Sequence, residues 1–353
     1  MTAQRLLLIV AVVQGAAILG LIAVLLVNRW LRRRRRSRVG PRRVVLDEAI
    51  KGWALGEVGP ELVVRALEAL PRGDAVAALL AWSVRLTGER WRALASALEH
   101  RPWTTHLRAA VRSRSWWRRL EAARFLSVAA TAADAGVLEQ LLKDPHPAVR
   151  VAIAVALERV AETRLVNAVL DRLPDMVGPM QAHYAAVLRG QHAVTVPLLI
   201  ERLGLVYDPG LRRIVEFAGR IGDARLREPI TALADHRDPE VRVQVARALG
   251  DYPHSRTVAV LRSLVTDSAW EVRAQAVRSL GRIAEAATLP DLQARLSDVV
   301  WWVRLRAALA LTRLGPPGRD ALLHAEVGAH PDARYVSRLI LGLSPQALAE
   351  FAA

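Results

Sequence analysis

The sequence predicts an all-α protein, in which an α-solenoid of stacked helix pairs is preceded by a single transmembrane helix. Three observations lead to this fold class. Alanine, leucine and arginine are abundant and aromatic residues make up only 5% of the chain, a composition that favours helix. A segment of about 31 residues recurs along most of the chain, which is typical of repeat folds. A long uncharged stretch near the amino terminus ends in a cluster of arginines.

Residues 1–28 are predicted to form the transmembrane anchor. Residues 6–27 contain no charged side chain, and a helix of that length spans about 33 Å, enough for a hydrocarbon core of roughly 30 Å. The apolar run ends in a strongly basic segment, as a stop-transfer sequence does and a cleaved signal peptide does not.

A basic linker, residues 29–46, follows the predicted anchor. Its positive charge predicts a single-pass protein of the inner (cytoplasmic) membrane, with the amino terminus outside and the solenoid in the cytoplasm. The arginines have two possible roles. They either set the topology and contact lipid headgroups in general, or they recognise particular anionic lipids. The residues expected at the membrane interface are Arg29, Trp30, Arg32, Arg33, Arg34, Arg35 and Arg36.

The formal net charge of +16 is concentrated in this basic segment. Ten arginines and no acidic residue precede Asp47, so that 40 basic side chains face 34 acidic ones in the rest of the chain. The chain after the basic segment is therefore only mildly basic for its size. This small excess of positive charge disfavours nucleic acid as the partner.

The repeat is recognised by an arginine that recurs every 30 or 31 residues, with one degenerate copy at Gln181. Small or aliphatic residues stand one position before this arginine and three, four and seven positions after it, which is one face of a helix. A shorter helix is expected before each of these helices, with Pro197, Pro229 and Pro290 at its start, and Gly250, Gly281 and Gly315 are expected at the ends of the longer helices. The repeat arginines are Arg119, Arg150, Arg212, Arg242, Arg273, Arg304 and Arg334.

The segment "DPEVRVQVARALG" at 238–250 resembles a HEAT repeat, and the short period is similar to that of the HEAT-like repeats first known from phycobilin lyases. The resemblance covers residues 111–345, is clearest at 238–315, and implies a right-handed solenoid. It also implies a ladder of hydrogen bonds between neighbouring repeats, in which Asp238 accepts from Arg242 and Asp208 accepts from Arg212. In two other copies, His146 and Val300 stand at the position of the aspartate. Residues 47–110 are predicted to form a divergent helical capping region, which a solenoid needs at its end.

No motif for chemistry is present in the sequence. There is no phosphate-binding loop, zinc-binding HExxH or nucleophile elbow, and the absence of cysteine excludes disulfides and thiolate metal sites. His236, Arg237 and Asp238 are interpreted as a repeat turn and not as a kinase motif. We therefore expect no catalytic residue, no metal site and no cofactor, and the protein is not expected to be an enzyme.

A binding surface is predicted at the exposed positions of the longer helices, two and five residues after the repeat arginine. This surface would be an apolar groove with a basic rim that receives a segment of a partner protein. The alternative is that the apolar members pack in the core, which is the default for apolar residues without a known partner. The predicted surface consists of Ile214, Phe217, Gln244, Arg247, Gln275, Arg278 and Arg306.

Two tryptophan doublets precede the repeat arginines of their copies. The first tryptophan of each, Trp116 and Trp301, stands where other copies carry proline, and we expect it to fill a gap between helix layers. The second, Trp117 and Trp302, stands where other copies carry glutamate, and we expect it to be exposed and to contribute to partner binding.

Together these features predict a membrane-tethered cytoplasmic scaffold that binds partner proteins through its solenoid. Two other functions stay open. One is nucleic-acid binding, as in some HEAT-like proteins. The other is a lyase or chromophore-handling role, which rests on analogy of fold alone.

Overall fold

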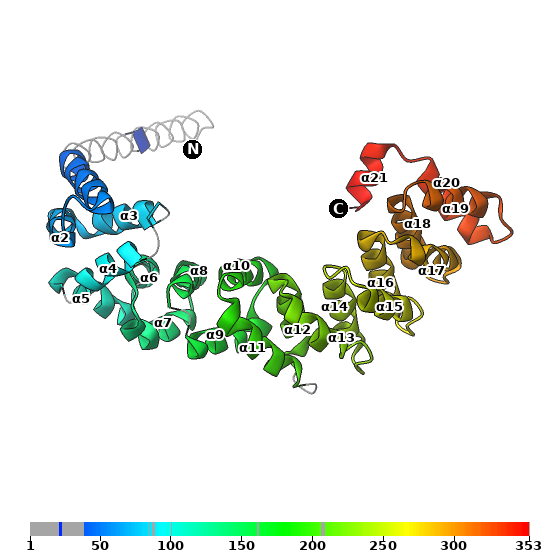
Figure 1. The fold of residues 1–353 in the computed structure, drawn as a ribbon, viewed down its shortest axis with the longest axis horizontal. Helices are drawn as coiled ribbons and strands as arrows, with labels where there is room; N and C mark the ends of the chain where they lie inside the picture. The colour runs from blue at the N-terminus through cyan, green and yellow to red at the C-terminus, as the bar shows by residue number, and fades with distance from the viewer. Residues whose placement is uncertain are drawn as a thin grey trace, which may run out of the picture. The chain divides into compact units, whose positions relative to one another are not determined.

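The computed structural model describes residues 21–22, 39–83, 85–86, 89–99, 101–160, 162–205 and 209–352. All regular secondary structure in these residues is helical (Figure 1). The chain divides into two compact units, Met1–Ala156 and Leu157–Ala353. The division falls inside the region where the sequence shows repeats, so that the repeats are shared between the two units.

The predicted anchor and its arginines, Arg29 and 32–36, together with Trp30, lie outside the described residues, apart from positions 21–22. In the part of the chain that the structure describes, no helix is long and apolar enough to cross a membrane. The first long described helix spans 39–55 and begins inside the segment predicted as a linker. Leu46 and Ile50 of this helix are fully buried, and this burial explains why the end of the basic segment is ordered as helix.

The first unit is built around one helix. In this unit α3, α4, α5 and α8 all pack on α6, whose Phe125 is fully buried. The Trp91 indole N–H donates to the Val128 carbonyl across the same core. The helices are α2 (Pro60–Glu68), α3 (Arg72–Ser83), α4 (Glu89–Leu98), α5 (Pro102–Ala109), α6 (Trp116–Ala129), α7 (Ala135–Leu142) and α8 (Pro147–Ala154).

The second unit consists of helix pairs that stack along the chain. The second helices of successive pairs pack on one another from α10 to α20, and the first helices lie in a layer beside them. The first helices are α9 (Thr163–Leu170), α11 (His192–Leu203), α13 (Arg227–Thr231), α15 (Ser255–Leu264), α17 (Leu289–Ala294) and α19 (Pro316–Val327). The second helices are α10 (Gly178–Arg189), α12 (Leu211–Ile221), α14 (Pro239–Leu249), α16 (Trp270–Ile283), α18 (Trp301–Arg313) and α20 (Pro331–Leu341), and α21 (Pro345–Ala352) follows them.

Helix α14 shows how the repeat sequence produces a second helix. The Asp238 carboxylate caps it by accepting from the Glu240 N–H at 2.9 Å, and Pro239 occupies the first helical position, where no N–H is needed. Val241 and Val245 are buried on the predicted face. Asp238 therefore caps its own helix and is not the partner of Arg242 in the ladder.

Two further expectations about helix ends are wrong. Pro197 lies inside α11, which begins at His192, so that this helix loses one internal hydrogen bond. Gly281 lies inside α16, because α16 continues to Ile283. Gly315 does follow the end of α18, with a φ of 69° that glycine adopts at little cost.

The glycines of the second helices allow these helices to approach closely. A Cβ atom built on Gly281 would lie 2.6 Å from the Ala310 Cβ, and one on Gly219 would lie 2.8 Å from the Ala248 Cβ. At the position between them, a Cβ on Gly250 would lie 2.7 Å from the Ser279 Oγ. The same contact thus recurs between successive second helices, and any larger side chain would force them apart.

The ladder between repeats exists, and its aspartates come from the next repeat turn. Arg242 donates from Nε and Nη2 to the two carboxylate oxygens of Asp267, both at 2.7 Å. Arg273 pairs with Asp298 in the same way at 2.8 and 2.9 Å, and each pair is separated by 25 residues. Each arginine also donates from Nη1 to two backbone carbonyls of its own turn. One side chain therefore ties two consecutive turns together.

The first unit contains the same pair, in which Arg119 donates to Asp144 at 2.6 and 3.1 Å. The ladder is thus present where His146 and Val300 occupy the expected aspartate position, because the pairing aspartate lies two residues earlier. Asp208, the other expected partner, lies outside the described residues.

Four other repeat arginines differ from this pattern. Arg150 and Arg304 donate to backbone carbonyls of their own turns, and Arg304 also lies 3.5 Å from Asp332. Arg212 contacts Glu240 at 3.5 Å, and Arg334 is exposed.

Candidate binding surface

The apolar middle of the predicted groove belongs to the core. Ile214 is 2% exposed and Phe217 is fully buried, because α12 packs between α10 and α14. The expectation that these two side chains form an open groove is therefore wrong. Their position in the repeat predicts exposure, but the helices on both sides of α12 cover that position.

The two glutamines of the predicted surface are also buried. Gln275 donates from Nε2 to the Ser279 Oγ at 3.2 Å within α16. Gln244 occupies the equivalent position in α14 and is buried as well, with no hydrogen bond to its Oε1 from the described residues. These buried amides are therefore not available to a partner as part of the predicted binding surface.

The arginines of the predicted surface do come together. Arg247 and Arg278 are exposed at equivalent positions of α14 and α16, and Arg306 of α18 is half-buried. Burial lowers the pKa of the Arg306 guanidinium, and repulsion from Arg278 and Arg247 lowers it further. The three guanidinium groups therefore share one region of positive potential, which favours an anionic group beside them.

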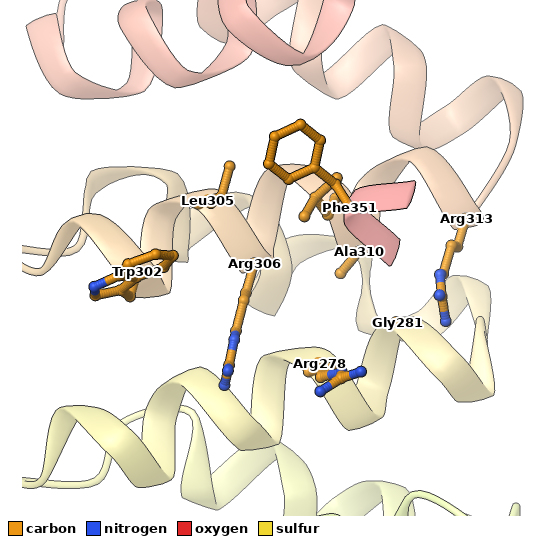
Figure 2. A pocket seen from close by; sticks show the side chains of 9 residues that line it. Arg278, Gly281, Trp302, Leu305, Arg306, Ala310, Arg313 and Phe351 are labelled. Atoms are coloured by element: carbon orange, nitrogen blue, oxygen red, sulfur yellow. The ribbon is translucent and has the colours of Figure 1, made fainter. Parts of the chain in front are cut away.

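A cavity of about 330 Å³ lies at the α18 end of this row of arginines (Figure 2). We call it the arginine pocket. Of the described residues, those that line it include three arginines and no carboxylate. They are Arg278, Gly281, Trp302, Leu305, Arg306, Leu309, Ala310, Arg313 and Phe351.

The pocket brings together five side chains that the sequence places far apart or does not single out. Three of them were expected at the surface: Trp302 and Arg306 of α18, and Arg278 of α16. Arg313 lies two turns beyond Arg306 on the same helix, a spacing that could have identified it. Phe351 comes from α21, and no repeat pattern points to it.

The tryptophan doublets divide as expected only in part. Trp302 and Trp117 are 55% and 54% exposed, and the Arg118 guanidinium lies 5.3 Å from the Trp117 ring centre. Trp301 is half-buried against Tyr335 with ring centres 5.7 Å apart. Trp116 stacks on His146 at 4.1 Å yet stays exposed, so it covers one ring of the next turn and does not fill a gap.

The geometry of this region bears on whether the protein could carry out chemistry. In the described part of the chain, no group of three or more His, Asp or Glu side chains is placed to hold a metal ion. The pocket itself offers guanidinium groups and apolar side chains. Such a set binds anions and apolar groups and supplies neither a nucleophile nor a general base.

The fold defines a helical repeat protein, and the comparisons identify the repeat. The family model for HEAT repeats matches residues 196–270, 226–312 and 261–342. These stretches include α16 and α18, which line the arginine pocket. Residues 196–342 therefore carry HEAT repeats, within the stacked helix pairs of the second unit.

Solved structures of similar architecture include three of natural proteins. YibA of Escherichia coli is 16% identical over 73% of this chain and 99% of its own, with a TM-score of 0.36. Human deoxyhypusine hydroxylase is 20% identical over 69% of this chain and 96% of its own, with a TM-score of 0.31. The CpcE–CpcF complex of phycocyanin lyase from Nostoc is 19% identical, covers 68% and 94%, and has a TM-score of 0.30. No curated protein sequence matches the chain.

Proposed function

We propose that this protein is a membrane-tethered scaffold whose HEAT-repeat solenoid holds a partner protein near the membrane. The observation that carries the proposal is the arginine pocket, where Arg278, Arg306 and Arg313 line one cavity with Trp302. Arginine and tryptophan are the side chains most enriched at the energetic centres of protein interfaces. The exposure of Trp302, at 55%, leaves its ring available to a partner.

Tethering to the membrane rests on the sequence before residue 39. The uncharged run 6–27 has the length of a membrane span, and the arginines that follow it match a cytoplasmic flank. A solenoid anchored in this way would confine its partner to the layer of cytoplasm next to the bilayer. Confinement of this kind raises the effective concentration of the partner for other membrane components.

A protein partner is favoured over nucleic acid by how the arginines of the second unit are used. Many of them pair with carboxylates of the chain itself, among them Arg242 with Asp267 and Arg273 with Asp298. The arginines of the pocket lie beside apolar side chains, among them Leu305 and Leu309. A nucleic-acid surface would instead present a long track of arginine and lysine facing successive phosphates.

Co-purification from detergent-solubilised membranes tests the proposal. We expect the tagged full chain to recover a stoichiometric partner protein, and the double variant Arg278→Glu/Trp302→Ala to lose it. Arg334→Glu is the matched control, because Arg334 is an exposed arginine of α20 outside the pocket. Far-UV circular dichroism should show equal helix content in all three proteins.

The proposal fails if no partner is recovered, or if both variants retain it equally. Salt-dependent binding of nucleic acid by the purified chain, lost in Arg278→Glu, would assign the pocket to the alternative class of partner. A ligand that absorbs visible light and copurifies with the chain would support the chromophore-handling alternative.

A further inference from the structure

The start of α6 carries an exposed cluster of arginine and tryptophan side chains in the first unit. No acidic residue stands between positions 112 and 118, and the two tryptophans are 46% and 54% exposed. We call this surface the tryptophan–arginine patch. It consists of Arg112, Arg114, Trp116, Trp117 and Arg118, all of which are exposed.

The positive charge of the patch is not compensated within the described part of the chain. Arg119, the next residue, donates to both carboxylate oxygens of Asp144. Among the described residues, by contrast, no carboxylate forms an ion pair with an arginine of the patch. Glu121, the acidic residue nearest in the sequence, is directed at α3, since its Oε1 would lie 3.6 Å from a Cβ atom on Gly73.

The second tryptophan doublet shows that this combination is particular to α6. Its second tryptophan is exposed as well, but the positions equivalent to the three arginines of the patch hold Ser297, Val299 and Val303. The position directly before the repeat arginine is a buried valine in α8, α14, α16 and α18, whereas in α6 it is the exposed Arg118. The start of α6 thus presents charge where the repeat is covered elsewhere.

Contacts within the unit hold the side chains of the patch in place. The Trp116 ring stacks on His146 at 4.1 Å, and the His146 imidazole is itself fixed, because its Nδ1 accepts from the Ala148 N–H at 3.3 Å. The Arg118 guanidinium lies 5.3 Å from the Trp117 ring centre. A surface ordered in this way loses little side-chain entropy when it binds.

We propose that the tryptophan–arginine patch docks on a bilayer that contains anionic lipids, as a second membrane contact beside the predicted anchor. Indole rings favour the level of the lipid headgroups, where their apolar body and their N–H are both satisfied. Guanidinium groups bind phosphate oxygens in bidentate geometry and are attracted by anionic headgroups. The patch is confined to one segment, whereas a nucleic-acid surface presents a longer track of basic residues.

The chain between the predicted anchor and the first unit is short enough to bring the patch to the bilayer, and the inference rests on the proposed function in this respect. Residues 29–38 connect the predicted anchor to the helix 39–55 and can span at most about 40 Å. That helix belongs to the same unit as the patch, because Trp82 of α3 donates to its Asp47 at 2.7 Å and α3 packs on α6. Docking would therefore be intramolecular, so that a patch with weak affinity of its own is enough.

A fluorophore placed beside each tryptophan doublet tests the docking in the full chain. The chain contains no cysteine, so that Ser115→Cys can be labelled selectively with nitrobenzoxadiazole. Val300→Cys is the matched control, because Ser115 and Val300 both stand directly before a doublet and neither side chain caps its helix. Each labelled chain is reconstituted in phosphatidylcholine vesicles with or without phosphatidylglycerol, and quenching by nitroxide-labelled lipid is measured. We expect strong quenching at position 115 in the anionic vesicles, weaker quenching in the neutral ones, and little at position 300.

Lifetime-resolved quenching gives the ratio of docked to undocked chains, which variants in the Ser115→Cys background should change. Arg112→Gln/Arg114→Gln should lower this ratio about 25-fold, since each arginine at an anionic surface contributes about fivefold. Arg65→Gln/Arg92→Gln is the matched control, because it removes the same charge from exposed arginines of α2 and α4, and it should leave the ratio unchanged. Circular dichroism should show equal helix content in all these chains.

Trp117→Ala tests the aromatic part of the contact and should also lower the ratio, to which a purely electrostatic contact would not respond. The docking is overturned if position 115 is quenched no more than position 300, if both double variants lower the ratio equally, or if Trp117→Ala leaves it unchanged. Loss of the quenching on addition of a stoichiometric single-stranded oligonucleotide would assign the patch to nucleic acid instead.

The outcomes separate this inference from the proposed function. If position 115 is quenched as expected and no partner protein is recovered from membranes, the lipid contact stands and the scaffold function fails. If a partner is recovered through the arginine pocket and position 115 is not quenched, the scaffold function stands and the lipid contact fails.

Discussion

At the scale of single residues, the ladder shows what a buried charge contributes to this fold. The Arg273 side chain is 11% exposed and that of Asp298 is 3% exposed. Asp298 also accepts from the Val300 N–H at 2.9 Å. Removing one member of such a pair leaves its partner's charge without compensation in a poorly solvated place, which costs more than the pair itself contributes.

We expect Asp298→Ala to lower the free energy of unfolding by about 2 to 3 kcal/mol, because Arg273 then loses its bidentate acceptor. Urea denaturation followed by circular dichroism measures the loss. The control is Glu228→Gln, which removes the exposed ion pair with Arg256 and should cost less than about 1 kcal/mol. Equal losses in the two variants would show that the ladder is no more than a surface contact.

The ladder also makes stability depend on pH. Burial alone would raise the pKa of the Asp267 and Asp298 carboxyls, but hydrogen bonds from Arg242 and Arg273 and from backbone N–H groups outweigh it and hold both pKa values below the usual range. The pKa of Asp144 is lowered in the same way, beside Arg119. The folded state therefore favours the ionised carboxylates, and their stabilising contribution is present above the unfolded pKa of about 3.9.

This contribution should be lost as the pH falls below about 4 and through the lowered pKa values of the folded state. We expect the melting temperature of the full chain to be nearly constant from about pH 7 to 5 and to fall steeply below about pH 4. Asp267→Asn should be less stable at neutral pH and should lose less on acidification. If the melting temperature of Asp267→Asn falls as much as that of the wild-type chain below about pH 4, other groups dominate the acid transition.

At the scale of helices, the spacing of the stack is set by small residues at one repeated contact. Gly281 is the clearest case, because an added Cβ would meet both the Cα and the Cβ of Ala310. Its place in the repeat predicts a helix end, since glycine is common there. Its position inside α16 shows that close packing, and not helix termination, requires it.

We expect Gly281→Ala to destabilise the chain by about 1 to 3 kcal/mol, because backbone atoms must shift to admit the methyl group. The control is Gly178→Ala at the start of α10, where no atom lies within 4 Å of an added Cβ. That substitution should be neutral or stabilise by up to about 1 kcal/mol. Thermal unfolding compares the two. A neutral Gly281→Ala would mean that α16 and α18 can separate freely.

At the scale of the whole molecule, the described residues form two helical units, and the segment expected to carry the membrane anchor precedes them. The chain contains no cysteine, which makes single introduced cysteines a clean probe of topology. We expect Ala3→Cys to react with a membrane-impermeant maleimide in intact cells, because the amino terminus is predicted to lie outside. Ser344→Cys should react only after lysis, and labelling at both positions before lysis would contradict the proposed topology.

Much of the architecture was predictable from the sequence because it depends on local patterns. An arginine every 30 or 31 residues and small residues on one helix face are visible without any structure, and they fixed the positions of α14, α16 and α18 closely. The exposure of Trp302 followed from comparing one position across copies. The helix face is decided by residues within a turn or two of one another, and the repeat period is found by comparing one copy with the next.

The sequence by itself thus determined the helical repeat and the arginines available to it, whereas only the tertiary structure decided their partners. The ladder joins residues 25 apart across two turns, and the correct aspartate depends on how one repeat is offset against the next. Phe217 is core because α10 and α14 cover α12. Phe351 reaches the arginine pocket because α21 folds back onto α18. These contacts depend on the packing of whole helices, which a pattern within a single repeat does not encode.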